Sequence, residues 1–238
     1  MMRIKIQISS DNGFFVPFKR AYEVSFFIRE ILKNTGIEEP YFNFSPFRSM
    51  NREISDEGIL LRNPIVLYIT SPIENYIKII EDFFKNNQKI SLFETELTIE
   101  KTVIFPPFEA DNEINKFKCL SPITVYKKYI TKEKEEKEIF LNPHDSEFYN
   151  LIRTNLTEKF RRIYGKLPQK SHLYIQFDKN YLIKKRKISK LVEIKGKKYK
   201  AWLSPFTMSG NKEIIQIAYD WGIGQLNSYG FGMIEVVR

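Results

Sequence analysis

The sequence is poor in the residues that build disulfides and metal sites. Its 238 residues include one cysteine, Cys119, and two histidines, His144 and His172. One cysteine excludes an internal disulfide, and together with two histidines it cannot make a typical structural zinc site. We therefore expect a protein without metal or other cofactor, in the reducing environment of the cytoplasm.

The sequence also lacks long hydrophobic runs. Its first residues, MMRIKIQISSDNG, contain no apolar segment of the kind found in secretory signals, and no uninterrupted apolar stretch is long enough to cross a bilayer. We expect no membrane association. Apolar residues still make up 42% of the chain, which is enough for the core of one large domain or of two small ones.

Glycine is scarce but concentrated near the C-terminus. Four of the ten glycines, Gly222, Gly224, Gly230 and Gly232, fall within eleven residues. Glycine is used where φ is positive or where another group approaches the main chain closely, so this spacing favours a loop that presents backbone N–H groups. An ordinary glycine-rich connection before a last strand is the alternative. The loop matches neither a dinucleotide-binding fingerprint nor a Gly-Lys-Ser/Thr phosphate loop.

Polar side chains lie among these glycines. Gln225, Asn227 and Ser228 bring hydrogen-bonding groups next to main-chain N–H groups that we expect to be exposed. Such a combination suits the phosphates and sugars of RNA. We therefore predict that the loop binds RNA through Gly222, Gly224, Gln225, Asn227, Ser228, Gly230 and Gly232.

Positive charge is concentrated in one stretch. The formal charge is +9, and residues 184–200 alone carry nine Lys or Arg against one Glu. Such crowded cations favour a polyanionic partner, and Tyr199 and Trp202 offer flat faces on which a base could stack. The predicted RNA contacts here are Lys184, Lys185, Arg186, Lys187, Lys190, Lys197, Lys198 and Lys200. Residues 131–138 balance their charges and predict a solvated hairpin or loop.

The pattern of apolar residues predicts the order of secondary structure. In the first half it predicts a strand at 2–9, a helix from Pro17 to Gly36, strands at 41–47 and 64–70, a helix at 71–86 and a strand at 90–105. Ser71 and Glu74 are expected to form a capping box at the second helix. This order is the split βαβ, or ferredoxin-like, unit.

The same order recurs in the second half. After a proline-containing linker at 105–117 come a strand at 119–130, a helix at 145–165, a strand at 172–177, a basic hairpin around Gly196, a short helix at 211–221 and a strand at 231–237. We predict an α+β protein of two tandem ferredoxin-like (βαββαβ) domains, residues 1–110 and 111–238.

The C-terminal pattern G-h-G-x5-G-h-G, present as GIGQLNSYGFG, resembles the glycine-rich loop of the CRISPR-associated repeat-RNA endoribonucleases of the repeat-associated RNA-binding superfamily. The segments MRIKIQI, FVPFKRAYEVSFFIREILK and CLSPITVYKK agree with this resemblance. It implies two ferredoxin-like domains that bind CRISPR repeat RNA. It also implies metal-free cleavage by attack of a 2′-OH, leaving a 2′,3′-cyclic phosphate.

The match fails at the expected catalytic histidine. Many members of that family place a histidine shortly after the first helix, a tyrosine within it and a lysine nearby, whereas this chain has no histidine before His144 and has Arg29 at the tyrosine position. The protein could cut RNA with other groups, or bind repeat RNA without cutting it as a subunit of an RNA-guided complex. A third reading uses His144 or His172. The sequence is compatible with a monomer or a homodimer.

Cleavage without histidine needs a cation for the phosphorane charge and groups that transfer protons. Lys19, Arg20 or Arg29 would stabilise charge, and Tyr22 or Tyr41 would transfer protons. The three cations could instead form the wet face of an amphipathic helix, and Tyr41 could pack in a strand. The predicted catalytic residues are Tyr22, Arg29, Tyr41 and Lys19.

Overall fold

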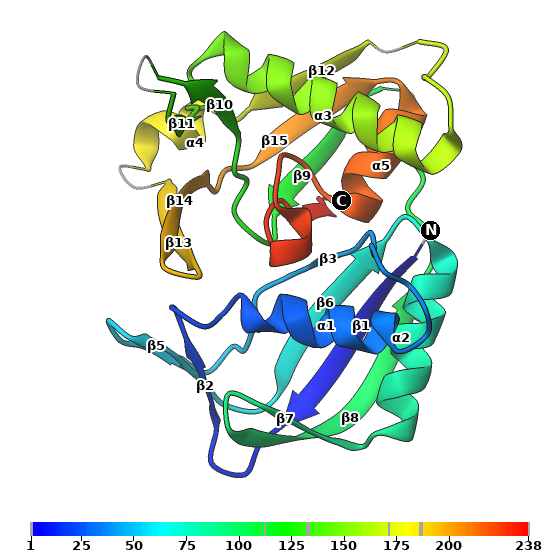
Figure 1. The fold of residues 1–238 in the computed structure, drawn as a ribbon, viewed down its shortest axis with the longest axis vertical. Coiled ribbons are helices and arrows are strands. Elements are labelled where there is room, and N and C mark those ends of the chain that lie inside the picture. Colours follow the sequence, from blue (N-terminus) through cyan, green and yellow to red (C-terminus); the bar gives the residue numbers. More distant parts are fainter. Residues whose placement is uncertain (1, 112, 132–133, 171, 186–187, 238) are drawn as a thin grey trace. The chain divides into compact units, whose positions relative to one another are not determined.

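The computed structural model describes residues 2–111, 113–131, 134–170, 172–185 and 188–237 (Figure 1). These residues divide into two compact units. Unit 1 extends to Phe108 and also contains Val192–Lys198 and Ser228–Gly230. Unit 2 contains Glu109–Leu191, Tyr199–Asn227 and the chain from Phe231 onward.

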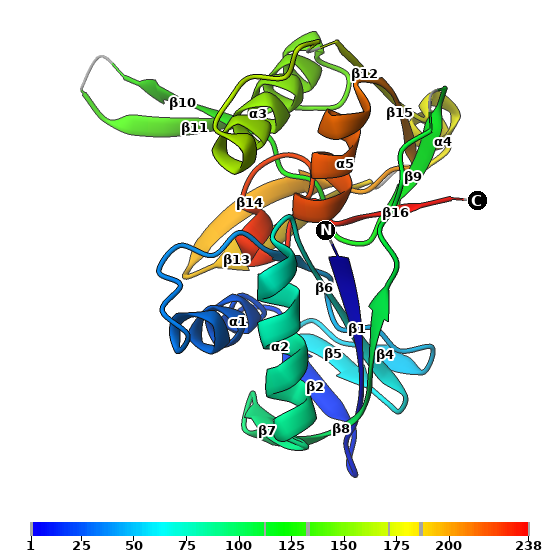
Figure 2. The same cartoon turned by 90° about the vertical axis from the view of Figure 1, so that its right-hand side faces the viewer.

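Unit 1 is built on an antiparallel sheet with the strand order β3-β6-β1-β8-β7. Helices α1 and α2 lie on the same face of this sheet (Figure 2). Ile4, Ile6 and Ile8 of β1 are at most 1% exposed, as the alternating pattern predicts. The bounds are β1 Met2–Ser9, α1 Glu23–Lys33, β3 Asn43–Phe44, β6 Ile65–Ser71, α2 Glu74–Asn86, β7 Lys89–Leu92 and β8 Thr95–Phe105.

Three short strands in unit 1 were not predicted. They are β2 (Phe14–Pro17), β4 (Arg52–Ile54) and β5 (Gly58–Leu61), which form a separate sheet in the order β2-β5-β4. Strands of three or four residues are too short to show a clear alternation, so no periodic signal marks them in the sequence.

Two local predictions in unit 1 are wrong. The single strand expected at 90–105 is a hairpin whose turn lies at Phe93 and Glu94, with φ of 51° and 55°. Glycine or asparagine normally marks such a turn, and neither occurs here. Ser71 does not cap α2, because it is still the last residue of β6; it accepts a hydrogen bond from the Ile73 amide and donates one to the Tyr41 carbonyl.

Unit 2 repeats the architecture with the strand order β12-β15-β9-β16. Helices α3 and α5 pack side by side on one face of its sheet (Figure 2). The bounds are β9 Asn115–Cys119, α3 Ser146–Tyr164, β12 Leu173–Phe177, β15 Phe206–Gly210, α5 Lys212–Trp221 and β16 Ile234–Val236. The described chain is thus α+β with two tandem ferredoxin-like units.

Smaller elements decorate unit 2. They are the hairpin β10 (Tyr126–Ile130) and β11 (Glu136–Phe140), the helix α4 (Lys179–Lys184), and the hairpin β13 (Ser189–Ile194) and β14 (Lys197–Trp202), whose turn end belongs to unit 1. The 3-10 turn η1 (Asn227–Tyr229) begins in unit 2, and its last two residues belong to unit 1. The strand predicted at 119–130 is wrong: β9 ends at Cys119, and a loop separates it from β10. The domain boundary after residue 110 stays a prediction.

Candidate nucleic-acid interface

Arg29 lies at the centre of a cluster on the first helix. Helical spacing buries Val24 and Ile28 of α1 in the core of unit 1 and leaves Arg29 half-buried on another face. Its Nη2 donates a hydrogen bond to the Ser228 hydroxyl at 2.5 Å, and its Nε donates one to the Ser25 hydroxyl at 3.3 Å.

The guanidinium of Arg29 also lies against aromatic rings. Its central carbon is 5.6 Å from the ring centroid of Phe42 and 5.7 Å from that of Tyr229. These contacts hold the flat cation in one orientation while it stays half-buried. A fixed guanidinium is well suited to recognise a phosphate.

The tip of the glycine loop, Ser228–Gly230, belongs to unit 1 together with this cluster. Gly230 has a φ of 82°, and a Cβ atom there would lie 2.8 Å from the ring of Phe44. Glycine is therefore needed at this position for both its backbone conformation and its close packing. This packing keeps Ser228 and Tyr229 next to Arg29.

The tip of the basic hairpin reaches the same helix. The Nζ atom of Lys195 lies 4.7 Å from the ring centroid of Phe26 in α1, and the ring of Tyr229 lies 6.4 Å from Phe26. Lys197 and Lys198 of the hairpin are exposed. The glycine loop and the basic hairpin, which the sequence could not place relative to each other, thus meet at Phe26.

The predicted catalytic residues do not all join this cluster. Tyr22 is the N-cap of α1, and its ring packs edge-to-face on Phe26 at 5.7 Å. Lys19 is exposed in the turn between β2 and α1. Burial raises the pKa of the Tyr76 phenol in α2, and Tyr41 makes a smaller contribution to this rise. Tyr41 therefore lies on the side of α2.

Arg20 is held by two carboxylates and is a poor candidate for a phosphate-binding cation. Its guanidinium forms ion pairs with Glu23 at 2.7 Å and with Glu94 at 2.8 Å. Hydrogen bonds to these two carboxylates, first to Glu23, raise the pKa of Arg20 above its ordinary value. Its charge is already balanced by neighbouring side chains.

The base of the glycine loop is buried in unit 2, which corrects the expectation of exposed amides. The amide of Gly222 donates to the Ala218 carbonyl, that of Ile223 to the Gly232 carbonyl, and that of Gly232 to the Pro122 carbonyl. A Cβ atom on Gly232 would lie 1.8 Å from the Ile223 carbonyl oxygen. These glycines permit close contact between main-chain segments, and their amides are used inside the fold.

Two polar side chains of the loop also have internal partners. The Gln225 side-chain oxygen accepts a hydrogen bond from the Tyr126 amide at 2.7 Å. The Asn227 side chain is 5% exposed and donates to the Phe231 carbonyl at 2.9 Å. These hydrogen bonds stabilise the conformation of the loop. Of the three polar side chains of the loop, only Ser228 lies in the Arg29 cluster.

Lys159 in α3 was not predicted from the sequence. It is 6% exposed, and its ammonium group donates to the carbonyls of Gly222 at 2.7 Å and Gly224 at 2.9 Å. Burial lowers its pKa well below the ordinary value, with a smaller contribution from Arg162. Its position three residues after the buried Leu156 and next to the buried Phe160 was the available signal.

The remaining cations of the basic stretch are exposed, but one predicted stacking face is not available. Trp202 is 5% exposed and its indole N–H donates to the Leu141 carbonyl at 2.8 Å, so it is a core residue. Lys200 lies against this ring at 5.0 Å. The exposed lysines here are Lys184, Lys185, Lys190, Lys197, Lys198 and Lys200, whereas Arg186 and Lys187 lie outside the described residues.

Neither histidine belongs to unit 1, and the cysteine is not a candidate nucleophile. His144 and His172 are exposed residues of unit 2. Burial raises the pKa of the Cys119 thiol to about 12, and the thiol donates to the Ser204 carbonyl.

Within the part of the chain that the structure describes, no three His, Cys, Asp or Glu side chains are grouped to hold a metal ion. No described helix has the length and apolar character needed to span a membrane.

The fold and this interface define a class: proteins of two tandem ferredoxin-like units whose C-terminal glycine loop is built into the fold. The C-terminal model of the CRISPR associated protein Cas6 matches residues 104–236, more than half of the chain. The chain therefore belongs to the Cas6 family.

Full-length relatives agree with this assignment. The chain is 26% identical to the CRISPR-associated endoribonuclease Cas6 1 of Methanocaldococcus jannaschii, over 100% of this chain and 93% of the relative. It is 28% identical to a Cas6 protein of Pyrococcus furiosus described as endoribonuclease-like, over 100% and 99%. The solved structure of a Cas6-related gene product of Pyrococcus furiosus superposes with a TM-score of 0.86 at 26% identity, covering 100% of this chain and 98% of that one.

Proposed function

We propose that the protein processes CRISPR RNA by binding the repeat of the precursor transcript and cleaving it. The reaction is attack of a 2′-OH on the adjacent phosphate without metal, which leaves a 2′,3′-cyclic phosphate and a 5′-OH. The observation that carries this proposal is the cluster on α1, where Arg29 contacts Ser228 and the tip of the basic hairpin contacts Phe26. Membership of the Cas6 family and the endoribonuclease relative support it.

In this mechanism Arg29 stabilises the charge that develops on the phosphorane. Its guanidinium is held by Ser25, Ser228 and the Tyr229 ring, so it needs little reorganisation when the charge forms. Lys195, at the tip of the hairpin, adds a second positive charge beside Phe26. Holding the attacking 2′-OH in line with the phosphodiester bond that breaks supplies much of the remaining rate acceleration.

Tyrosines are the groups available for proton transfer at this cluster. Tyr22 packs on Phe26, and Tyr229 lies against Arg29. The O–H of a phenol can act as the acid for the leaving 5′ oxygen. The catalytic roles of Lys19 and Tyr41 stay predictions. The contacts described for the Arg29 cluster do not include either residue, so the proposed mechanism does not use them.

RNA binding is assigned to the exposed lysines of the basic stretch and to the loop tip. Lys197 and Lys198 lie beside the hairpin turn, close in sequence to Lys195, which contacts Phe26. Cations of this kind contact phosphates without reading the sequence. Ser228 and Gly230 are the loop residues that this proposal retains as RNA contacts.

Binding of repeat RNA without cleavage is the second candidate. It is favoured by the absence of histidine from the residues of unit 1, because an imidazole is the commonest acid or base in such reactions. The similarity to a relative described as endoribonuclease-like also supports it. In this form the protein would be a subunit of an RNA-guided complex.

Product analysis with labelled repeat RNA tests the proposal. We expect fragments that end in a 2′,3′-cyclic phosphate and begin with a 5′-OH. Replacing Arg29 by Gln (Arg29→Gln) should lower the cleavage rate about 10²–10³-fold, because it removes a positioned charge. Lys33→Gln, an exposed position on the same helix, serves as the control. Intact RNA recovered from the wild-type protein would favour the second candidate.

A further inference from the structure

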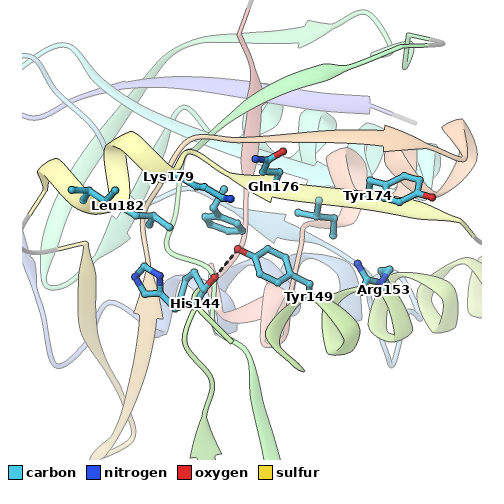
Figure 3. Close-up of a pocket in the computed structure, with 11 residues that line it drawn as sticks. His144, Tyr149, Arg153, Tyr174, Gln176, Lys179 and Leu182 are labelled. Atoms are coloured by element: carbon cyan, nitrogen blue, oxygen red, sulfur yellow. Dashed lines mark hydrogen bonds between the residues drawn. The ribbon is translucent and has the colours of Figure 1, made fainter. Parts of the chain in front are cut away.

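A groove of about 650 Å³ lies on unit 2 where β12, the first half of α3 and α4 meet (Figure 3). All of its lining residues lie between Pro143 and Ile183, within unit 2. This volume falls in the range of about 300–1,000 Å³ that is common for ligand sites. The reaction proposed above uses none of the residues in this groove.

The strand β12 turns polar and aromatic side chains outward at the groove. Along this strand Leu173, Ile175 and Phe177 are buried, and the alternation leaves Tyr174 and Gln176 exposed. Tyr174 is 69% exposed, so its ring is accessible to a ligand. An exposed ring beside an amide can stack on a base and bond to its edge.

Two cations, Arg153 and Lys179, are among the residues that line the groove. Figure 3 shows Arg153 on α3 and Lys179 on α4, with His144 nearby. No carboxylate is among the lining residues described. The groove is therefore positively charged at its walls.

The acidic residues closest in sequence to the groove are not among its lining residues. Glu147 forms an ion pair with Lys127 at 2.8 Å. Asp145 accepts the amide of Asn142, and Asp178 accepts the amide of Tyr181. Asp145 and Asp178 keep their negative charges, but the charged side chains that line the groove, among the residues described, are Arg153 and Lys179. The lining itself therefore favours an anionic occupant.

We propose that this groove binds single-stranded RNA as a second site, distinct from the cluster at Arg29. A base stacks on Tyr174, and phosphates contact Lys179 and Arg153. The inference rests on the proposed function only in taking RNA as the substrate. An acidic peptide would also suit the charge, but it gives no reason for the exposed ring beside Gln176.

The position of α4 connects this groove to the basic stretch. Lys179 begins α4, Lys184 ends it, and Lys185 follows, and all three are exposed. A strand held in the groove can therefore continue along cations that the sequence already predicts as RNA contacts. RNA that flanks the repeat is the segment that this site would hold.

Fluorescence anisotropy with an unstructured RNA oligonucleotide that lacks the repeat sequence tests the site. The double variant Tyr174→Ala/Lys179→Ala should bind it about tenfold more weakly than the wild type. The slope of log affinity against log salt should flatten by about 0.7 for the cation that is removed. The control is Tyr164→Ala/Lys166→Ala, which removes an aromatic ring and a cation at the other end of α3.

Photo-crosslinking of the same oligonucleotide carrying 4-thiouridine gives a readout that needs no variant. Mass spectrometry should find the crosslink on the peptide that contains Tyr174. Unchanged affinity in the double variant, or crosslinks only elsewhere, overturns the inference. Displacement by poly-glutamate without any decrease of RNA affinity in the variant overturns it in favour of a protein partner. Failure of the wild type to cleave repeat RNA counts against the proposed function alone.

Discussion

The Arg29 side chain is preorganised to bind an anionic ligand. Its nitrogens bond to two serine hydroxyls, Ser25 and Ser228, and its flat face lies on Phe42 and Tyr229. The partners described for it are neutral. Its positive charge therefore remains available to a phosphate, unlike that of Arg20, which is paired with Glu23 and Glu94.

Lys159 has the opposite role at the same scale. Its ammonium group is buried and bonds to two loop carbonyls, those of Gly222 and Gly224. Without this donor each carbonyl loses the hydrogen bond that it accepts from Lys159. Lys159 therefore anchors the start of the glycine loop.

Replacing Lys159 by methionine should destabilise the protein. Leaving two buried carbonyls without this donor costs about 1–3 kcal/mol each, and removal of a buried charge offsets part of that cost. We expect the free energy of unfolding to fall by about 2 kcal/mol, measured by urea denaturation. Lys166→Met, at an exposed position beyond α3, should change it by less than about 0.5 kcal/mol. A stability unaffected by Lys159→Met would show that the anchor is dispensable.

The same residue predicts a dependence of stability on pH. Burial lowers the pKa of Lys159 in the folded state, so the unfolded state holds more protons between that lowered pKa and the ordinary value of 10.5. Stability attributable to this group must therefore rise with pH across that window. Urea denaturation from about pH 7 to about pH 10 should show this rise in the wild type relative to Lys159→Met. A difference that is constant with pH would contradict it.

At the scale of elements, the glycine loop and the basic hairpin are each divided between a buried base and a tip in unit 1. The loop amides at Gly222, Ile223 and Gly232 bond within unit 2, whereas Ser228 reaches Arg29. The hairpin likewise ends at Lys195, against Phe26. The tips are therefore the parts of these elements that can act on RNA beside α1.

Separating the tip of the hairpin from its flank tests this division. Lys195→Ala/Lys197→Ala/Lys198→Ala should weaken binding of repeat RNA and reduce its salt dependence by about 0.7 in the log–log slope for each phosphate that the variant no longer neutralises. The cleavage rate should also fall, because Lys195 lies at the catalytic cluster. A slope identical to that of the wild type would remove the hairpin tip from the interface.

The flank gives the matched comparison for that experiment. Lys184→Ala/Lys185→Ala/Lys190→Ala removes the same number of exposed charges from residues that unit 2 contains. We expect it to weaken binding while leaving the rate of cleavage at saturating RNA close to that of the wild type. Equal decreases of rate in both triple variants would argue for a general effect of charge.

The elements also show where sequence patterns sufficed and where they failed. The alternation of Ile4, Ile6 and Ile8 and the long apolar stripe of α3 predicted these elements correctly. The turn at Phe93 and Glu94 was missed, because residues without special turn propensity adopt positive φ there. In the site, Arg29 was singled out because it stands where the family resemblance places a tyrosine, whereas Lys159 was missed because lysine is rarely buried.

At the scale of the whole molecule, composition limits the chemistry. The chain carries a formal charge of +9 with one cysteine and two histidines, and its described residues include no group of His, Cys, Asp or Glu that could hold a metal. The protein therefore has ample positive charge for binding RNA.

In the metal-free mechanism proposed above, removal of metal leaves cleavage unaffected. We expect the same rate and the same product ends in EDTA as in magnesium at matched ionic strength, because the nucleophile is the 2′-OH of the RNA itself. The measurement is the single-turnover rate with labelled repeat RNA. Loss of cleavage in EDTA that returns with added magnesium would overturn the metal-free mechanism.

The sequence by itself determined the order of the elements, the α+β class with its two ferredoxin-like units, and the two segments richest in glycine and in positive charge. These features depend on local periodicity and composition, which are readable along the chain. Only the tertiary structure decided which groups meet. In the fold, Ser228 contacts Arg29 although the two residues are 199 positions apart in the sequence. Lys159 is buried against the glycine loop, and Trp202 is a core residue. Contacts between distant residues depend on packing, which no local sequence pattern records.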